Sequence, residues 1–406
     1  FKKKRKKKKE EQRRRIKKKT MTTVAGNIPL DLTIEILLRL PGESVLRFRC
    51  VSKTWCSIIR SRRFADAFMS LSLSRPRLLL AFSNHSDNRL KFFSSPNQNS
   101  SFPLPSSMVA AKDNTLTMPE IRSGDHIVQR NSVRGFVCCS LRTRFAVCNP
   151  TTRQVISLPE KPGSYVSWDR ECYMFLGYDP SKDQYKVLRL DMKVAAGRPI
   201  EHSVCTLGGR RRLSCYSWRS IKSSILYYGC NYNGLCIDGI VYFEAGLEPL
   251  NNSKTVSSFD VGSEQLGLIK TPEDFSCGFL TNYLGKLAAY DPIERNGCYT
   301  LWVLDDVKNH VWSERVFVFS SLSSSLCWDL GLSFAGMTAA GEIVLVPMWY
   351  YEPFEIFCYN VEKKVERRVR VKGLEGNIYD GVSSCPVGQE SNPSASCCYV
   401  DNITYL

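Results

Sequence analysis

The chain has 406 residues, of which 43% are hydrophobic and 11% aromatic, a composition that favours more than one folded domain. No apolar run is long enough to cross a bilayer, and the start lacks the apolar stretch of a signal peptide, so we expect no membrane partner. The 17 cysteines are odd in number and include no CxxC pair, which disfavours a disulfide framework or a zinc site. This cysteine usage favours a reducing compartment, the cytoplasm and/or the nucleus.

The formal charge of +17 is concentrated at the start, where residues 1–20 hold 14 Lys or Arg and 2 Glu. Such a block repels itself and buries nothing, which predicts a disordered basic tail over residues 1–26. It could serve as a nuclear localisation signal or as a nonspecific anchor for nucleic acid or acidic lipid. The alternative is that residues 1–20 are upstream translation or a gene-model artefact, since Met21 offers a start just before the first ordered segment. We do not favour a nucleic-acid partner.

Residues 27–73 predict a unit of three or four short helices. Pro29 suits a helix start, where its missing N–H costs nothing, and Pro41-Gly42 ends that helix. Ser52 can cap a later helix. So small a unit encloses little core, and we expect it to lean on a partner. The apolar positions of the segment include Leu32, Ile36, Leu37, Leu40, Phe48, Val51 and Trp55.

Residues 75–400 predict an all-β domain, because short β-rich apolar runs alternate with Asp, Asn, Gly and Ser turns. We interpret the Ser/Asn/Pro stretch from Ser94 to Ser107 as a long surface loop within this domain. The strands predicted are Leu78–Phe82, Arg89–Phe93, Phe136–Cys139, Phe145–Cys148, Val187–Leu190, Ile240–Phe243, Thr300–Leu304, Val311–Phe319, Ile343–Val346 and Phe357–Tyr359.

A faint internal repeat runs through the β domain. In each unit a Gly opens an apolar strand, and an Asp or Asn follows at the end of a later strand. The pairs are Gly239 with Asp260, Gly285 with Asp305, Gly341 with Asn360, and, at a shorter gap, Gly135 with Asn149. Successive units start 46 and 56 residues apart, close to the roughly 40–50 residues of a four-stranded propeller blade. A β-propeller is therefore favoured, and a β-sandwich with similar hairpins is the alternative.

Two resemblances give these domains an identity. Residues 28–64 resemble the F-box, with Ile28-Pro29, Ile36-Leu37, Leu40-Pro41 and the run from Arg47 to Trp55 in register; Ile28 replaces the usual Leu. The β domain resembles the F-box-associated domain of the plant family often labelled F-box/kelch-repeat, in pieces such as RGFVCCS, VCNPTTRQVISLP and FLGYDPSKDQYKVLRL. It departs from true kelch repeats, which carry a Gly-Gly pair in each blade, since only Gly208-Gly209 is present.

The resemblance implies a substrate-recognition subunit of a Skp–cullin–F-box ubiquitin ligase. The F-box would dock a Skp-family adaptor, and through it a cullin and a RING protein, while the β domain would capture a target protein. The alternative is an F-box scaffold or sequestering protein that acts without ubiquitin transfer. We assign adaptor binding to Ile28, Pro29, Leu32, Ile36 and Leu37, and assign Leu40, Phe48, Val51 and Trp55 to the F-box core or an extended interface.

Catalysis is not expected. The four histidines fall in separate segments without HExxH or HxH spacing, and no GxSxG, GxGxxG or P-loop motif occurs. We expect no cofactor and no metal. Target binding would use aromatic and arginine anchors in loops at one end of a propeller channel, and the alternative is that these aromatics pack the core. The residues assigned to target binding are Trp168, Arg170, Trp349, Tyr350 and Tyr351.

Overall fold

The computed structural model describes residues 29–84, 89–95, 107–109, 111–117, 128–141, 144–161, 170–193, 200–208, 216–225, 227, 229–247, 254–275, 278–295, 298–319, 331–350, 352–374 and 391–406. The chain divides into two compact units, Phe1–Ala67 and Phe68–Leu406, with the division inside one helix. The basic tail lies outside the described residues. None of the helices among them is long and apolar enough to span a membrane.

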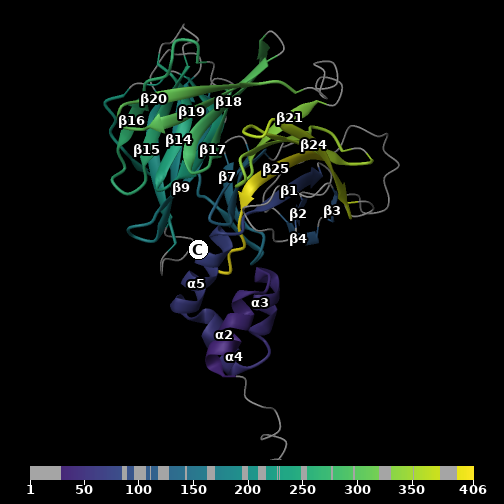
Figure 1. The fold of residues 1–406 in the computed structure, drawn as a ribbon. Coiled ribbons are helices and arrows are strands. Elements are labelled where there is room, and N and C mark those ends of the chain that lie inside the picture. Colours follow the sequence, from purple (N-terminus) through teal and green to yellow (C-terminus); the bar gives the residue numbers. More distant parts are fainter. Residues whose placement is uncertain are drawn as a thin grey trace, which may run out of the picture. The chain divides into compact units, whose positions relative to one another are not determined.

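The described part of the first unit is helical (Figure 1). Pro29 precedes the first helix in extended geometry, and its carbonyl accepts a hydrogen bond from the Thr33 amide at 2.9 Å. The Ser52 Oγ caps a later helix by accepting from the Trp55 amide at 3.1 Å, as the sequence predicts. The helices are α2 (Leu30–Leu38), α3 (Gly42–Phe48), α4 (Lys53–Arg60) and α5 (Arg62–Leu73), the last extending into the second unit.

The second unit forms, in its described residues, six sheets that follow one another as the blades of a propeller, with antiparallel pairing throughout except between β24 and β3 (Figure 1). This confirms the propeller over the sandwich. From the inner to the outer strand, blade 1 is β25 (Ser391–Tyr399), β1 (Arg77–Asn84), β2 (Arg89–Ser94) and β4 (Ala111–Thr117), and blade 2 is β5 (Val128–Val133), β6 (Phe136–Leu141), β7 (Arg144–Asn149) and β8 (Gln154–Ser157).

The other blades repeat this order. Blade 3 is β9 (Arg170–Asp179), β10 (Gln184–Lys193), β11 (Glu201–Leu207) and β12 (Arg219–Ser220); blade 4 is β13 (Gly229–Ile237), β14 (Ile240–Gly246), β15 (Lys254–Asp260) and β16 (Leu266–Ile269). Blade 5 is β17 (Phe279–Tyr283), β18 (Lys286–Arg295), β19 (Cys298–Asp306) and β20 (Val311–Phe317). Blade 6 is β21 (Leu332–Met337), β22 (Glu342–Pro347), β23 (Glu355–Asn360), β24 (Val365–Lys372) and a fifth strand, β3 (Ser107–Val109).

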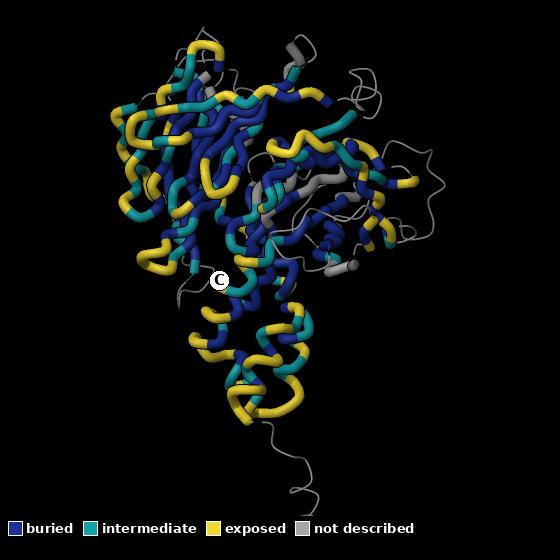
Figure 2. Tube along the Cα trace, in the orientation of Figure 1, coloured by how far each residue is buried: buried dark blue, intermediate teal, exposed yellow. Residues whose placement is uncertain are grey.

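Within the described part of the propeller, the buried apolar residues form six clusters, one at each junction between neighbouring blades. Strand β1 shows why the apolar runs are continuous rather than alternating. Leu78, Leu80 and Phe82 face blade 6, whereas Leu79 and Ala81 face blade 2. Because successive side chains point to opposite faces and both faces are covered, apolar residues are favoured at successive positions. Figure 2 shows the result, with buried strands inside and exposed residues at the turns.

The ring closes between the two ends of the β domain. Strand β25 pairs antiparallel with β1 and supplies the inner strand of blade 1. The residues after β25 continue onto blade 2, where the Asn149 side-chain amide donates to the carbonyls of Asn402 and Thr404, each at 3.0 Å. A buried ion pair between Arg77 and Asp401, at 2.9 Å, holds the same segment. The folded domain thus extends beyond residue 400, where the sequence placed its end.

The glycine and Asp/Asn positions of the repeat have separate structural roles. The four glycines of the repeat sit in the turns between first and second strands with positive φ, which favours glycine: Gly135, Gly239, Gly285 and Gly341. The Asp/Asn side chains accept backbone N–H groups in the turns between third and fourth strands. In blade 5 this residue is Asp306, not the predicted Asp305, whose carboxylate instead pairs with Lys286 at 2.6 Å.

Candidate protein-docking surfaces

Helix α2 carries apolar side chains on its exposed surface. Leu32 is 51% exposed and Ile36 is 47% exposed, and four-residue spacing places them on one face with the exposed Pro29 at the start. Exposed leucine and isoleucine in a contiguous stripe, rather than scattered singly, mark a surface that a partner covers.

Leu37 does not belong to that surface. It is fully buried, together with Thr33, on the face of α2 that packs into the unit. Leu37 was assigned to adaptor binding, but its burial indicates a residue of the core of the helical unit. Ile28 lies outside the described residues. The sequence reasoning also missed Leu30, which is 56% exposed, because it falls outside the four-residue stripe from which the set was chosen.

The residues assigned to the F-box core or an extended interface also differ in exposure. Phe48 and Trp55 are half-buried and pack ring to ring, with centroids 5.0 Å apart, so they join α3 to α4. Leu40 is also half-buried. Val51, by contrast, is 60% exposed and is available to extend an interface.

In the propeller, two ends must be distinguished. The "turn end" holds, in blades 2, 4, 5 and 6, the short turns between strands one and two and between strands three and four, and the "loop end" is the opposite end of the propeller. Because the strand order repeats around the ring, the start of β9 and the connection from β22 to β23 belong to the same, loop end. Of the residues predicted to bind a target, the backbone of Arg170 and the residues Trp349 and Tyr350 thus lie at this one end of the propeller.

The aromatic residues at the loop end differ in how far they are exposed. Trp349 is 42% exposed, and its neighbour Met348, which the sequence reasoning missed, is 49% exposed. Tyr350 is buried and packs its ring on Phe82 and Phe354, with centroids 6.0 and 5.7 Å away. It is a core residue, as the alternative for these aromatics held. Trp168, Tyr351 and the side chain of Arg170 lie outside the described residues.

Burial shifts the pKa values of two cysteines and one histidine of the propeller toward their neutral forms. No group of three or more His, Cys, Asp or Glu side chains in the described part of the chain could hold a metal ion. Burial raises the pKa of the Cys172 and Cys358 thiols to about 12, so neither is a thiolate nucleophile near neutral pH. His202 is buried, its Nε2 has no hydrogen-bond partner among the residues that the structure describes, and burial lowers its pKa to about 4. His85 and His126 lie outside the described residues.

Comparison with known families agrees with this architecture. The F-box domain matches residues 26–66, and the F-box associated beta propeller domain matches residues 77–399. Together they define an adaptor-type protein with a helical docking module and a β-propeller. The chain belongs to the plant family of F-box proteins that carry an F-box associated beta propeller domain.

Several relatives in Arabidopsis thaliana share nearly the whole length. F-box protein At1g30790 is 38% identical over 368 residues, covering 86% of this chain and 90% of the relative. F-box protein DOR is 34% identical, covering 86% and 88%. Among solved structures, a chain of a nidogen/laminin complex aligns at a TM-score of 0.43 with 8% identity, covering 80% of this chain and 99% of that chain.

Proposed function

We propose that this protein is the substrate-recognition subunit of a Skp–cullin–F-box ubiquitin ligase, acting in the cytoplasm and/or the nucleus. The observation that carries the proposal is the exposed apolar stripe of Pro29, Leu32 and Ile36 on a unit that belongs to the F-box family. In this role the stripe binds a Skp-family adaptor, which bridges to a cullin and a RING protein. The propeller holds the target, and the other subunits perform the transfer of ubiquitin, so this chain itself is not the enzyme.

Adaptor binding is expected to fail in the double variant Pro29→Ala, Ile36→Ala. Truncating interface anchors typically costs about 2 kcal/mol or more each, enough together to remove binding from a pull-down. The measurement is co-purification of a recombinant Skp-family adaptor with the full chain. The matched control is Val316→Ala, Val318→Ala, which truncates two similarly exposed apolar side chains of the propeller. Adaptor binding that survives in the first variant, or is lost equally in both, contradicts the assignment.

A scaffold that binds the adaptor without ubiquitin transfer is the second candidate. The two functions predict different effects of the F-box on the abundance of the captured proteins. With the proteasome inhibited, proteins captured both with and without residues 29–66 are bound by the propeller. Of these, the proteins that accumulate only when the F-box is absent, in cells whose proteasome is active, are substrates. Captured proteins whose abundance never depends on the F-box support the scaffold instead.

A further inference from the structure

The turns between the third and fourth strands follow one pattern, from which blade 5 departs. In blades 2, 4, 5 and 6 an Asp or Asn opens the turn, and its fifth residue has a positive φ: Arg153, Glu264, His310 and Lys364. The second residue of the turn is apolar and, in three of these blades, buried: Pro150, Val261 and Val361. In blade 5 the equivalent residue is Val307, which is 48% exposed. A side chain that is buried elsewhere in the repeat therefore lies at the surface of blade 5.

The turn between the first and second strands of blade 5 exposes a second apolar side chain, that of Leu284. This leucine is 53% exposed and has φ +51°, whereas the residues at the same position in blades 2 and 4 are polar: Arg134 and Asp238. Left-handed backbone is unfavourable for bulky apolar residues, and Asn or Asp adopts it more readily. Blade 5 therefore has an exposed leucine where the backbone geometry favours a polar residue, which indicates a use for its side chain.

The fourth strands of blades 5 and 6 begin with exposed valines. In blades 2 and 4 the residue after the positive-φ position is a glutamine, Gln154 and Gln265. In blades 5 and 6 it is Val311 and Val365, and both side chains are exposed. Positions that are polar in blades 2 and 4 are thus apolar and exposed in two neighbouring blades.

Side-chain contacts join these turns at the turn end of blades 5 and 6. The Lys286 Nζ lies 2.6 Å from the Asp305 Oδ1, which holds the two turns of blade 5 together. The Tyr283 hydroxyl donates to the Glu362 Oε1 at 3.2 Å, which joins the first turn of blade 5 to the outer turn of blade 6. The exposed apolar side chains of these turns therefore belong to one surface, here called the blade 5–6 patch: Leu284, Val307, Val311 and Val365.

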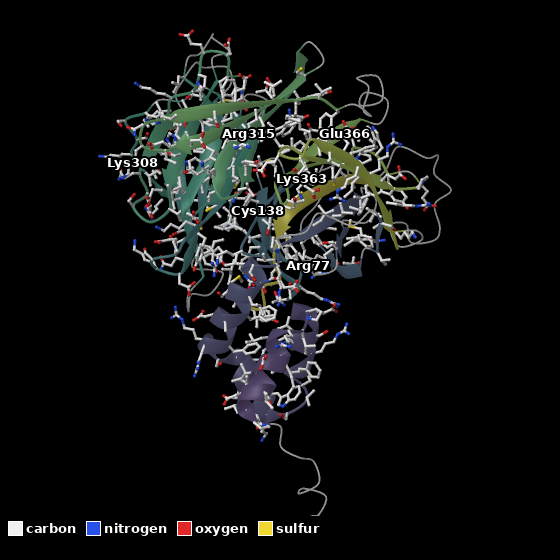
Figure 3. All side chains as sticks on the ribbon, viewed as in Figure 1. Arg77, Cys138, Lys308, Arg315, Lys363 and Glu366 are labelled. Atoms are coloured by element: carbon white, nitrogen blue, oxygen red, sulfur yellow. The ribbon has the colours of Figure 1, made fainter. Side chains whose placement is uncertain are left out.

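The charged groups around the patch leave it positive. Lys308, Lys363 and Lys364 are exposed, and their ammonium groups make no ion pair with any residue that the structure describes. Figure 3 labels Lys308 and Lys363 together with Arg315, whose guanidinium donates to the Tyr283 hydroxyl at 3.1 Å. The carboxylates of these turns already accept hydrogen bonds within the protein: Asp305, Asp306 and Glu362. A segment that covers the patch therefore meets apolar side chains bordered by lysines.

We propose that the blade 5–6 patch binds an acidic segment of the target protein that also carries apolar side chains. The inference rests on the proposed function and names the class of segment that the propeller captures. Apolar side chains of the segment cover Leu284 and the three valines, and its carboxylates pair with the three lysines. The apolar contacts are needed because ion pairs between exposed groups contribute little on their own. The site lies at the turn end and is separate from Trp349 at the loop end.

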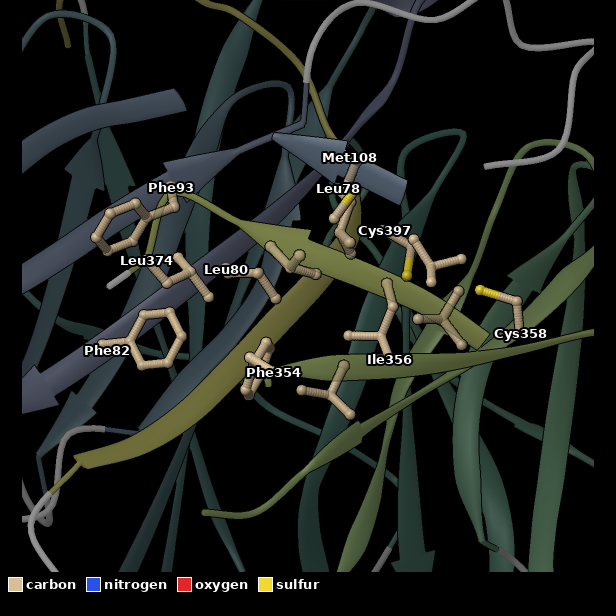
Figure 4. Packing of buried hydrophobic residues seen from close by; sticks show 14 of the residues in the cluster. Leu78, Leu80, Phe82, Phe93, Met108, Phe354, Ile356, Cys358, Leu374 and Cys397 are labelled. Carbon is tan, nitrogen blue, oxygen red and sulfur yellow. The ribbon is translucent and has the colours of Figure 1, made fainter. Parts of the chain in front are cut away.

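The competing explanation is that these are single exposed side chains without a role, which are common at protein surfaces. The core of blade 6 shows the contrast, because Ile356 and Cys358 of β23 are buried at the junction between blades 6 and 1 (Figure 4). Val365, on the adjacent strand, is exposed instead. Binding that depends on the valines of the patch, and not on equally exposed valines elsewhere, distinguishes the two explanations.

The test is fluorescence anisotropy of the full chain with a labelled peptide that contains four Glu and four Leu. Two control peptides keep the same order but replace every Glu by Gln or every Leu by Ser. We expect the parent peptide to bind at least about tenfold more tightly than either control, because the patch offers both positive charge and apolar surface.

Two pairs of valines provide matched variants. Val311→Gln, Val365→Gln introduces the residue that blades 2 and 4 carry at these positions and should lower the affinity for the parent peptide about tenfold. Val316→Gln, Val318→Gln makes the same change at two similarly exposed valines elsewhere in the propeller and should change the affinity less than about twofold.

Leu284→Asn separates a role in binding from a role in folding. Asn suits the left-handed position, so the melting temperature should stay the same or rise, whereas the affinity for the parent peptide should fall at least about threefold. A melting temperature that falls while the affinity is unchanged assigns Leu284 to folding and contradicts its place in the patch.

Other outcomes contradict the proposal in different ways. Equal binding of the three peptides, or equal loss in both valine variants, shows nonspecific attraction. A single-stranded RNA that binds more tightly than the parent peptide shows a polyanion site. A dimer in sedimentation velocity that Val311→Gln, Val365→Gln dissociates makes a second copy of the chain the occupant. No peptide binding, while the adaptor still co-purifies, rejects the patch and leaves the proposed function standing. Failure of the unaltered chain to bind the adaptor rejects the proposed function itself.

Discussion

At the residue scale, the exposure of single side chains decides which of them can bind a partner. Leu37 and Ile36 are adjacent in the sequence and equally apolar, yet one is fully buried and the other 47% exposed. The sequence shows that both residues are apolar, but it does not show which of them is buried. Neighbouring positions on a helix differ in direction by only about 100°, so both lie near the boundary between the buried and the exposed face. That division depends on where α3 and α4 pack.

The two residues should respond differently to substitution. Leu37→Ala removes buried contacts and should lower the free energy of unfolding of the helical unit by about 2–5 kcal/mol. Ile36→Ala should leave stability within about 1 kcal/mol and weaken adaptor binding instead. Urea denaturation of each variant, followed by circular dichroism, measures the first effect. An Ile36 variant that unfolds as readily as the Leu37 variant would place Ile36 in the core.

His202 should make the propeller sensitive to acid. Burial lowers its pKa from 6.5 to about 4, so the unfolded chain binds a proton at this residue before the folded chain does. The free energy of unfolding is therefore unaffected by this residue above about pH 6.5. It decreases as the pH falls from about 6.5 toward 4, by up to about 3 kcal/mol in total.

The measurement compares urea denaturation at about pH 7 and about pH 5 for the wild-type chain and His202→Leu. The variant cannot take up that proton, so its stability should fall less over the same interval. An identical loss in both proteins would show that His202 has no part in the acid response.

At the scale of elements, the turns were more predictable than the strands that close the ring. The positive-φ glycines of the repeat were visible as a period, and each predicted strand except the last residues of Val311–Phe319 lies within an observed one. Strand β25, by contrast, reads SNPSASCCY and contains Pro393, which the sequence does not distinguish from a loop. Strand β3 begins at Ser107, the last residue of the stretch from Ser94 to Ser107 that the sequence predicts to be a surface loop. Both become strands through tertiary pairing.

Substituting two glycines that share a positive φ distinguishes the cost of backbone strain from the cost of steric overlap. Gly135 has φ +82°, and a Cβ there would lie 2.4 Å from the Val400 carbonyl oxygen. Gly285 has φ +87°, but a Cβ there would meet nothing within 4 Å. We therefore expect Gly135→Ala to destabilise the propeller by several kcal/mol and Gly285→Ala by about 1 kcal/mol. Thermal denaturation of both variants tests this, and equal losses would mean that the segment after β25 does not pack on the Gly135 turn.

At the scale of the whole molecule, the ring depends on pairing between residues more than three hundred positions apart in the chain. The pairing of β25 with β1 and the hydrogen bonds of Asn149 to the segment after β25 hold the first and last parts of the domain together. Such long-range contacts carry no local signature, which explains why family resemblance and periodicity, rather than individual residues, predicted the propeller. The exposure of the aromatic residues assigned to target binding was the least predictable feature, because the exposed Trp349 and the buried Tyr350 are adjacent aromatic residues in the sequence.

The division of labour between the two units is the central claim, and ubiquitin transfer to a captured target tests it most directly. With purified adaptor, cullin, RING protein and ubiquitin-activating and -conjugating enzymes, the wild-type chain should support modification of a protein that its propeller binds. Pro29→Ala, Ile36→Ala should still bind that protein but should no longer support its modification, whereas Val316→Ala, Val318→Ala should do both. Undiminished modification with the first variant, or none with a wild-type chain that holds both adaptor and target, would contradict the account.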